Sequence, residues 1–374
     1  MNIKFYFQLV FGVFSLKRNN MRWFNMKRIV FCLFVLPIFI SLLIINHFFL
    51  LLDYILFPHF IRQKIKDPVY IISAPRSATT FLFHSMAQIK NRYTSVKLWE
   101  IIFAPSVTQK FIVIFIFKID GLLRYPLRKI IRFCENLLFG KFKKIHVIGL
   151  ELPEEDEGFL IWNFATLYHN FFYCDATFFE DFYQFDKSMN PRAKKRIMTT
   201  YCNYIKRHNF VFNRKGDRQF LSKNPLMMNK IDSLHSIFPD ALIININRDL
   251  ADTLPSTLAL NRSIIGTFTS KKISESVELE TIKQLIEWYS MAHESLITKF
   301  PNQHIRVDFK KLIQQNTDEI KRISNFLSLP LNDLVLPVNN SVKAHKSINP
   351  YERMTKENLA PILLKLPFMN EYCN

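Results

Sequence analysis

The segment from residue 67 to residue 89 constrains the fold of this chain most. Asp67–Pro68 is followed by a short apolar run rich in β-branched residues, Val69–Ile72, which predicts a buried parallel strand. A loop of small residues, Ser73–Thr80, comes next, and a helical pattern runs from Phe81 to Ile89. This order of strand, loop and helix places backbone N–H groups and a helix N-terminus around a phosphate. The segment therefore predicts an α/β fold with an anion site at a strand end.

The loop itself offers positive charge and hydroxyl donors. Arg76 supplies the charge, hydroxyl groups come from Ser77, Thr79 and Thr80, and the small Ala78 lets the backbone close on an anion. The loop lacks the Gly-Lys-Ser/Thr ending of a Walker A motif. Taken alone, it is also compatible with a plain strand-to-helix turn that is capped by a threonine.

A second strand and helix carry a further candidate phosphate ligand. Ala241–Asn247 predicts another buried strand with Arg248 at its carboxyl end, and Asp249–Leu260 predicts a helix that carries Ser256. An arginine fork and a serine hydroxyl so placed can converge on one phosphate, because ligands of open α/β sheets bind at the carboxyl ends of strands. Taken alone, an arginine there is more often part of a surface salt bridge.

The two motifs together resemble the donor site of sulfotransferases that use 3′-phosphoadenosine-5′-phosphosulfate (PAPS). The loop sequence PRSATT is similar to the PRSGTT loop of bacterial and membrane-linked members, with Ala78 in place of the usual glycine. Arg248, Asp249 and Ser256 match the 3′-phosphate motif R-D-P-x-x-x-x-x-S, with Leu250 in place of proline. The resembling group includes tyrosylprotein and lipid-type sulfotransferases. Looser similarity extends through LWEIIFAPSVTQK, FLSKNPLMMNKIDSLHSIFPDA and IRVDFKKLIQQNTDEIKRISNFLSLP.

This resemblance implies a three-layer α/β sandwich with a central parallel sheet, the P-loop-NTPase-like sulfotransferase fold. It implies an enzyme that transfers a sulfuryl group from PAPS to a hydroxyl or amine of an unidentified acceptor. No metal is expected, because arginine and lysine side chains can neutralise the leaving bisphosphate. The expected donor-binding residues are Arg76, Ser77, Ala78, Thr79, Thr80, Arg248 and Ser256.

Two basic residues are candidates for the transfer step. Arg76 stands where cytosolic family members carry a loop lysine. Lys223 closes the expected strand Phe220–Ser222, where the resembling enzymes place a lysine that contacts the sulfate. A solvated lysine at a strand end is the alternative for Lys223.

The candidate base that accepts the acceptor's proton is a carboxylate. Cytosolic members place a histidine two residues after the strand-end lysine, but Pro225 stands there in this chain. The acidic run Glu151–Glu157 resembles an acidic motif of the bacterial group, and Glu155 is the first candidate, followed by Glu154 and Asp156. A solvated acidic face at a helix N-terminus is the alternative. Weaker candidates are His84, His146 and Asp175.

A long apolar segment near the N-terminus predicts a membrane anchor. Ile29–Ile45 is nearly all apolar, and a second apolar run, Phe48–Phe57, follows Asn46–His47. The segment is either one long helix kinked near Pro37 or a hairpin that turns at Asn46–His47. Basic residues on both sides suit an anchor whose two ends share one anionic surface. The apolar stretch 101–119 is either a core helix or a second membrane-facing surface.

Composition favours lipid over nucleic acid as the anionic partner. Lys and Arg number 50 against 31 acidic residues, a net charge of +19, and 49% of the chain is hydrophobic, with 38 Phe. The sequence carries no zinc-finger spacing and no RNA-binding signature. The scattered cysteines form no CxxC pair and predict buried reduced thiols: Cys32, Cys134, Cys174, Cys202 and Cys373.

We expect an anchoring region at 1–66, a sulfotransferase domain at 67–350 and a tail at 351–374. A basic cluster, Lys343–Lys346, precedes the tail. A Phe-rich acceptor region near 90–215 suits a lipid, a glycolipid or another amphiphilic small molecule. The Lys-, Ile-, Asn- and Phe-rich composition suggests a bacterial inner membrane with the domain in the cytoplasm, and a eukaryotic source would imply a Golgi-type membrane.

Two other functions stay open from the sequence. A P-loop-like kinase or phosphotransferase would use a similar strand and loop, but it needs a lysine after the glycines and an acidic strand end for magnesium. A catalytically silent membrane scaffold of the same fold would explain Ala78 and Leu250.

Overall fold

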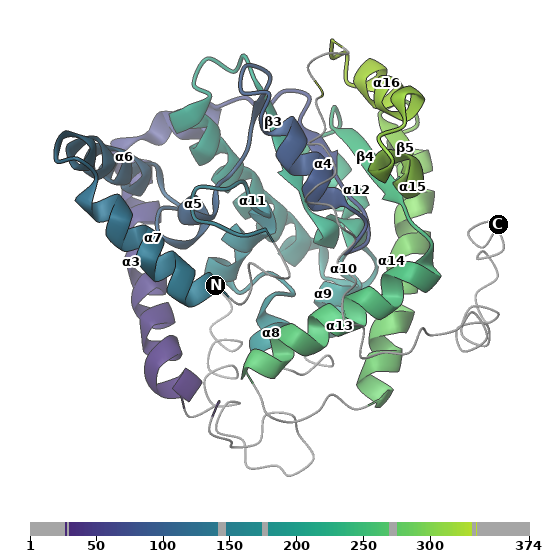
Figure 1. Ribbon diagram of the computed structural model, residues 1–374, viewed down its shortest axis with the longest axis horizontal. Helices are drawn as coiled ribbons and strands as arrows, with labels where there is room; N and C mark the ends of the chain where they lie inside the picture. The colour runs from purple at the N-terminus through teal and green to yellow at the C-terminus, as the bar shows by residue number, and fades with distance from the viewer. Residues whose placement is uncertain are drawn as a thin grey trace.

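A five-stranded parallel sheet lies at the centre of the computed structural model, which describes residues 27, 30–140, 147–173, 179–268, 275–330 and 334 (Figure 1). Its strands lie in the order β2-β3-β1-β4-β5. They are β1 (Val69–Ile71), β2 (Tyr93–Thr94), β3 (Gln219–Lys223), β4 (Leu242–Asn247) and β5 (His304–Asp308). The α-helices are α3 (Leu36–Leu56), α4 (Thr79–Met86), α5 (Leu98–Ile102), α6 (Val107–Leu122), α7 (Pro126–Phe139), α8 (His169–Tyr173), α9 (Glu180–Tyr183), α10 (Phe185–Ser188), α11 (Pro191–Phe212), α12 (Ile231–Ile237), α13 (Leu250–Phe268), α14 (Glu275–Lys299), α15 (Phe309–Ile313) and α16 (Thr317–Phe326).

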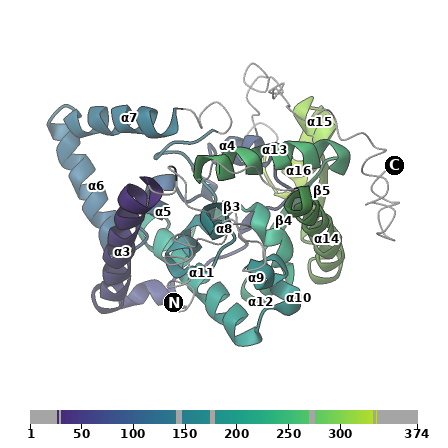
Figure 2. The same cartoon turned by 90° about the horizontal axis from the view of Figure 1, so that it is seen from below.

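Two apolar cores cover the two faces of the sheet. Successive side chains of a strand point to opposite faces, so Val69 and Ile71 pack with α4 and α16 while Tyr70 packs with α11, α12 and α14. Figure 2 shows α4 on one side of the sheet and α11 and α12 on the other. Burial on both faces explains why the central strand β1 is apolar throughout, whereas the edge strand β5 alternates buried and exposed residues. The predicted three-layer α/β fold is confirmed.

Strand register brings the carboxyl ends of β1, β3 and β4 together. Ile71, the last residue of β1, pairs with Lys223 on one side and with Ile244 on the other. The loop that leaves β1 therefore lies between the end of β3 and the end of β4. This is the edge at which open α/β sheets bind ligands.

The N-terminal apolar segment forms one helix. A π-helical turn, Phe31–Val35, leads directly into α3, because Pro37 lacks the N–H that an α-helix would use there. The helix continues through Asn46–His47, so the predicted alternative of a hairpin that turns there is wrong. Within the described residues, Leu33–Leu56 is the one helical stretch long and apolar enough to cross a membrane.

Helix α3 packs against the domain through polar side chains. The Asp53 carboxylate accepts hydrogen bonds from the backbone N–H groups of Val107 (2.8 Å) and Thr108 (3.0 Å), and from Nε of Arg207 (2.9 Å). The Asn46 side chain accepts from Gln109 at 2.7 Å.

The domain boundaries that we expect after residues 66 and 350 remain predictions. The basic cluster 343–346 and the C-terminal tail 351–374 lie outside the described residues.

Candidate active site

The loop between β1 and α4 has an unusual backbone. Arg76 and Ala78 both adopt positive φ angles, +68° and +60°, and Ala78 is the N-cap residue that directly precedes α4. In this left-handed region a Cβ atom crowds the carbonyl oxygen that follows, which is why glycine is favoured there. The geometry thus explains the glycine of the resembling loops, and Ala78 occupies its conformation at some steric cost.

Replacing Ala78 by glycine is expected to be neutral or stabilising. Glycine removes a steric penalty of about 1 kcal/mol, which offsets its larger entropy loss on folding. The β-branched variant Ala78→Val should instead destabilise the loop. The unfolding temperature and the affinity for nucleotide should both be at least as high for Ala78→Gly as for the original protein. Both should be lower for Ala78→Val. A glycine variant that unfolds at a lower temperature than alanine would contradict this account of the loop.

The two predicted phosphate motifs meet at the sheet edge. Nε of Arg76 donates a hydrogen bond to Oγ of Ser256 at 3.1 Å, and Nη1 of Arg248 donates to the backbone carbonyl of Arg76. Burial lowers the pKa of both guanidinium groups, and the charge of Arg76 lowers that of Arg248 further. Arginine stays charged even so. Two neighbouring cations that are partly removed from water form a strong site for an anion.

Buried polar atoms without protein partners lie at this site. In the described part of the chain, Oγ of Ser77 and Nε of Arg248 are buried and lack a hydrogen-bond partner. Unsatisfied buried polar atoms are uncommon in folded proteins. Both atoms can donate to a phosphate oxygen.

Phe309 positions Arg248, a contact that the sequence did not predict. The guanidinium carbon lies 4.4 Å from the centre of the Phe309 ring, which follows β5 at the start of α15. A cation over an aromatic face is attracted by the ring quadrupole. The only available signal was that Phe309, like Arg248, directly follows a strand.

Lys223 and Glu155 form an ion pair next to the loop. Nζ of Lys223 lies 2.6 Å from Oε1 of Glu155, 3.4 Å from Oγ1 of Thr80 and 3.9 Å from Oε1 of Glu154. Burial alone would lower the pKa of Lys223, but Glu155 and Glu154 outweigh it and the pKa is raised. Lys223 is therefore a buried cation, and the alternative of a solvated lysine is wrong.

Glu155 keeps an accessible carboxylate while Tyr168 fixes its orientation. The Glu155 side chain is 20% exposed, against 2% for Lys223. The hydroxyl of Tyr168 donates to Oε2 of Glu155. Burial and then the charge of Glu155 raise the pKa of Tyr168, so its hydroxyl remains a donor. No sequence motif pointed to Tyr168.

The next two acids of the run have structural partners instead. Asp156 accepts hydrogen bonds from the hydroxyls of Tyr201 (2.6 Å) and Ser222 (3.0 Å), and burial raises its pKa to about 7. Glu157 lies 2.6 Å from Nζ of Lys230. Both carboxylates are buried, so the alternative of a solvated acidic face is wrong for them. Their contacts tie the turn that carries Glu155 to the end of β3.

The remaining candidates contribute less. His84 lies in the last turn of α4 against the ring of Phe83, and His146 and Asp175 lie outside the described residues. Across the described ranges, no group of three His, Cys, Asp or Glu side chains could hold a metal ion. Cys134 is a free thiol but is exposed on α7, so its predicted burial is wrong.

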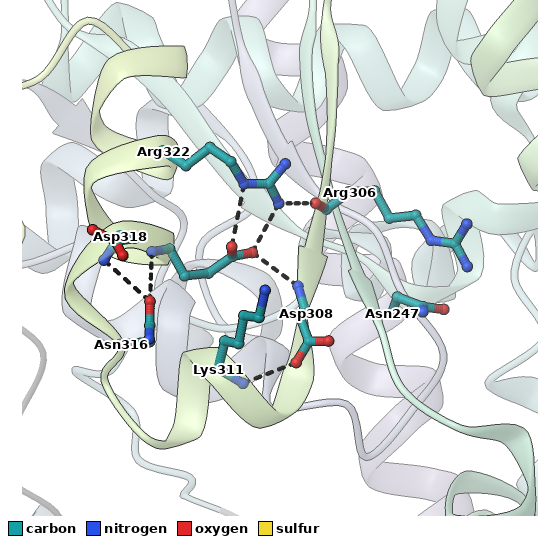
Figure 3. Close-up of a pocket in the computed structure, with 8 residues that line it drawn as sticks. Asn247, Arg306, Asp308, Lys311, Asn316, Asp318 and Arg322 are labelled. Atoms are coloured by element: carbon teal, nitrogen blue, oxygen red, sulfur yellow. Dashed lines mark hydrogen bonds and ion pairs between the residues drawn. The ribbon is translucent and has the colours of Figure 1, made fainter. Parts of the chain in front are cut away.

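A mixed-charge pocket lies on the outer side of β5 (Figure 3). Its charges largely engage each other: Glu319 accepts from the backbone N–H of Asp308 at 2.9 Å and from Arg322 at 2.8 Å. These contacts fix the junction between β5 and α15. They thereby fix the position of Phe309, whose ring lies against Arg248. The pocket is lined by Asn247, Arg306, Asp308, Lys311, Asn316, Asp318, Glu319 and Arg322.

Comparisons with known proteins find similarity to sulfotransferases. A model of the sulfotransferase family matches residues 163–333, which contain Lys223, Arg248 and Ser256. A Caenorhabditis elegans protein named "Putative protein-tyrosine sulfotransferase" is 26% identical over 117 residues. The aligned region spans 31% of this chain and 42% of the length of that relative.

Two solved structures share the fold. Sulfotransferase STF1 from Mycobacterium tuberculosis superimposes with a TM-score of 0.61 at 13% identity, over 89% of this chain and 84% of its own. Sulfotransferase STF9 from Mycobacterium avium gives a TM-score of 0.60 at 14% identity, over 86% and 81%. The family model matches the part of the chain from residue 163 to residue 333, and the two structures show that the chain shares the fold of sulfotransferases.

Proposed function

We propose that this protein transfers a sulfuryl group from PAPS to a hydroxyl or amine of an amphiphilic acceptor at a membrane. The observation that carries the proposal is the meeting of Arg76, Arg248 and Ser256, which come from two motifs far apart in the sequence. The match to the sulfotransferase family model and the shared fold support the same reaction class. Residues 67–350 would act as the transferase domain.

The donor would be held at both of its phosphate-bearing ends. The β1–α4 loop, with Arg76, Ser77 and the backbone around Ala78, would bind the 5′-phosphosulfate, together with Thr79 and Thr80 at the start of α4. Arg248 and Ser256 would bind the 3′-phosphate. Because ATP lacks a 3′-phosphate, this second contact would distinguish the donor from ATP.

Transfer would proceed by in-line displacement at sulfur. The acceptor oxygen or nitrogen forms a bond to sulfur while the bond from sulfur to the bridging oxygen of the 5′-phosphate breaks, and adenosine 3′,5′-bisphosphate leaves. Glu155 takes the proton of the acceptor. Lys223 and Arg76 neutralise the charge that grows on the leaving group. Lys223 suits this role because it lies between Glu155 and Thr80 in the first turn of α4.

Aromatic side chains beside Glu155 support an amphiphilic acceptor. Tyr168, which contacts Glu155, is followed by His169, whose ring stacks on Phe164 at 5.0 Å. Phe39 of α3 packs edge-on against His169 at 6.3 Å and stacks on Trp162 at 5.4 Å. These rings, of which His169, Phe164 and Trp162 are buried, pack the segment that follows Glu155 against the apolar helix. The candidate base would thus lie close to a helix that can hold the apolar tail of a lipid or glycolipid.

The two rival functions fit the site less well. Kinases and related phosphotransferases use an acidic side chain at a strand end to hold magnesium. Here the strands on either side of β1 offer no acid, because β3 ends in Lys223 and β4 is followed by Arg248. The acidic strand end, Asp308 of β5, caps α15 by accepting from the backbone N–H of Lys311. A silent scaffold has no need of a buried lysine paired with an accessible carboxylate.

Binding of adenosine 3′,5′-bisphosphate tests the donor site. Calorimetry on the full chain in detergent should show tighter binding of the bisphosphate than of adenosine 5′-monophosphate or ATP. Arg248→Ala should weaken bisphosphate binding about 100-fold, the worth of a two-pronged charged contact, and leave monophosphate binding nearly unchanged.

The matched control is Arg306→Ala, which removes an arginine from the neighbouring strand β5. This variant should bind the bisphosphate like the original protein. Equal or tighter binding of ATP, or equal losses in the two arginine variants, would exclude the proposed donor and favour the kinase or scaffold alternative.

A further inference from the structure

Helices α3 and α6 have their polar and apolar faces inverted relative to those of a water-soluble protein. Lys110 of α6 is fully buried and donates to the carbonyl of Ala104 at 2.7 Å, whereas Phe115 on the same helix is 63% exposed. On α3, Asp53 is fully buried and Ile55 is 76% exposed. A helix that faces water shows the opposite arrangement. Polar groups that face inward and apolar groups that face outward are typical of helices in lipid.

Helix α7 extends this surface and adds positive charge. Ile130 and Phe133, three residues apart, form an apolar stripe that is 60% and 71% exposed. Lys129 and Arg132 are exposed on the same helix. An apolar stripe flanked by basic residues is the pattern of a helix that lies in the interface of an anionic membrane.

The three helices lie together on one side of the protein. Both Figure 1 and Figure 2 place α3, α6 and α7 at the side opposite β5 and α16. The large exposed apolar residues are concentrated here: Leu33, Phe34, Val35, Ile38, Ile44, Ile45, Phe48, Leu51, Tyr54, Ile55 and Leu56 on the α3 segment; Phe111, Ile112, Phe115, Ile116, Ile119 and Leu122 on α6; Tyr125, Ile130 and Phe133 at and on α7. An exposed apolar surface of this size marks an interaction site.

Both ends of the α3 segment are held by the same domain. At its start, Nζ of Lys27 donates to the carbonyl of Gly266 in α13 at 2.5 Å. Beyond its end, Gln63 donates to the carbonyl of Asn213 at 3.1 Å. The 24 residues from Leu33 to Leu56 span about 36 Å, more than the roughly 30 Å of a bilayer core. A helix that crossed the bilayer would put these two contacts on opposite sides of it.

We infer that α3, α6 and α7 form one monotopic docking surface, which sinks into a single leaflet of an anionic bilayer. Helix α3 then lies along the membrane and does not cross it. The inverted helices provide the apolar contact, and Lys129 and Arg132 provide the attraction to anionic headgroups. This inference is independent of the transfer chemistry and stands or falls without it.

Vesicle flotation of the full chain tests the charged part of the surface. The protein, diluted from detergent, should float with vesicles of phosphatidylglycerol and phosphatidylcholine and bind more weakly to phosphatidylcholine alone. The double variant Lys129→Glu with Arg132→Glu should bind the anionic vesicles at least about tenfold more weakly, since each basic residue near such a surface contributes roughly 1 kcal/mol. The control Lys195→Glu with Arg196→Glu makes the same change of charge on α11 and should bind like the original protein.

Equal losses in the two double variants would overturn the docking surface, because they would indicate a nonspecific effect of net charge. If the protein instead forms a defined dimer without detergent and binds neither type of vesicle, the apolar face is an interface with a second copy of the chain.

Cysteine labelling tests whether α3 crosses the bilayer. Single cysteines at Lys27 and Lys64, which flank the α3 segment, are introduced into a cysteine-free variant whose unfolding temperature matches that of the original protein. Protein that is added to sealed vesicles should react with a membrane-impermeant maleimide at both positions. Protection of either position until detergent is added would show a crossing helix and overturn the inference.

Discussion

Replacing Glu155 by glutamine is expected to lower the rate of sulfuryl transfer by about 10²–10⁴-fold, the usual contribution of a general base. Glutamine keeps the size of the side chain and can still accept from Tyr168, but it cannot take the acceptor's proton. Binding of adenosine 3′,5′-bisphosphate should survive, because Arg76, Arg248 and Ser256 are unchanged. The rate is measured as transfer of radiolabelled sulfuryl groups from PAPS into a total lipid extract.

The matched control is Glu154→Gln. This glutamate lies 3.9 Å from the same lysine but is not hydrogen-bonded to it, whereas Glu155 lies at 2.6 Å. Both variants remove one negative charge beside Lys223, so a purely electrostatic role would give similar losses. A much larger loss in Glu155→Gln identifies the base, and similar losses in the two variants would remove that role from Glu155.

The donor motifs were predictable because their information is local. The runs at Val69–Ile72 and Ala241–Asn247 alternate little and are rich in β-branched residues, which marks strands buried on both faces. The structure places strands at 69–71 and 242–247. A residue at the end of such a strand must lie at the carboxyl edge of the sheet. The meeting of Arg76 with Arg248 and Ser256 then follows from adjacent parallel strands.

Two other contacts of the site were not predictable in the same way. Tyr168 reaches Glu155 because the short 3₁₀ helix Asp156–Asn163 between them turns the chain back, and Phe309 reaches Arg248 because β5 lies next to β4. A tyrosine or phenylalanine in a Phe-rich chain carries no signal of such a role. The acidic run Glu151–Glu157 was ambiguous for the same reason. Nothing in its sequence indicates that Glu155 is accessible while the neighbouring Asp156 is buried and accepts a hydrogen bond from Tyr201.

The apolar segment was recognised from composition, but its polar residues were misleading. In the sequence Asn46–His47 suggested a turn, and Asp53 merely interrupted an apolar run. In the structure Asn46 and Asp53 share the buried face of one helix with Leu43 and Leu50. Their spacing of three or four residues per step is a helical stripe. This spacing can be read from the sequence. The residues that pair with the stripe, Gln109 of α6 and Arg207 of α11, cannot.

Replacing Asp53 by alanine is expected to lower the free energy of unfolding by about 3–5 kcal/mol, as for other buried ion pairs that lose one partner. The variant leaves Arg207, which is 4% exposed, without its counter-charge and strips the N–H groups of Val107 and Thr108 of their acceptor. The measurement is chemical unfolding of the full chain in detergent micelles.

Asp120→Ala separates the ion pair from ordinary helix capping. The Asp120 carboxylate is also buried and accepts from the backbone N–H groups of Leu127 (2.7 Å) and Arg128 (3.3 Å) at the start of α7, but it forms no ion pair with a side chain described here. Loss of such a cap costs about 0.5–2 kcal/mol. The double variant Asp53→Leu with Arg207→Met should recover most of the loss, because it removes both charges and leaves neither buried alone. If Asp53→Ala costs no more than Asp120→Ala, the ion pair does not hold α3 to the domain, and the helix would then be free to leave it and cross a bilayer.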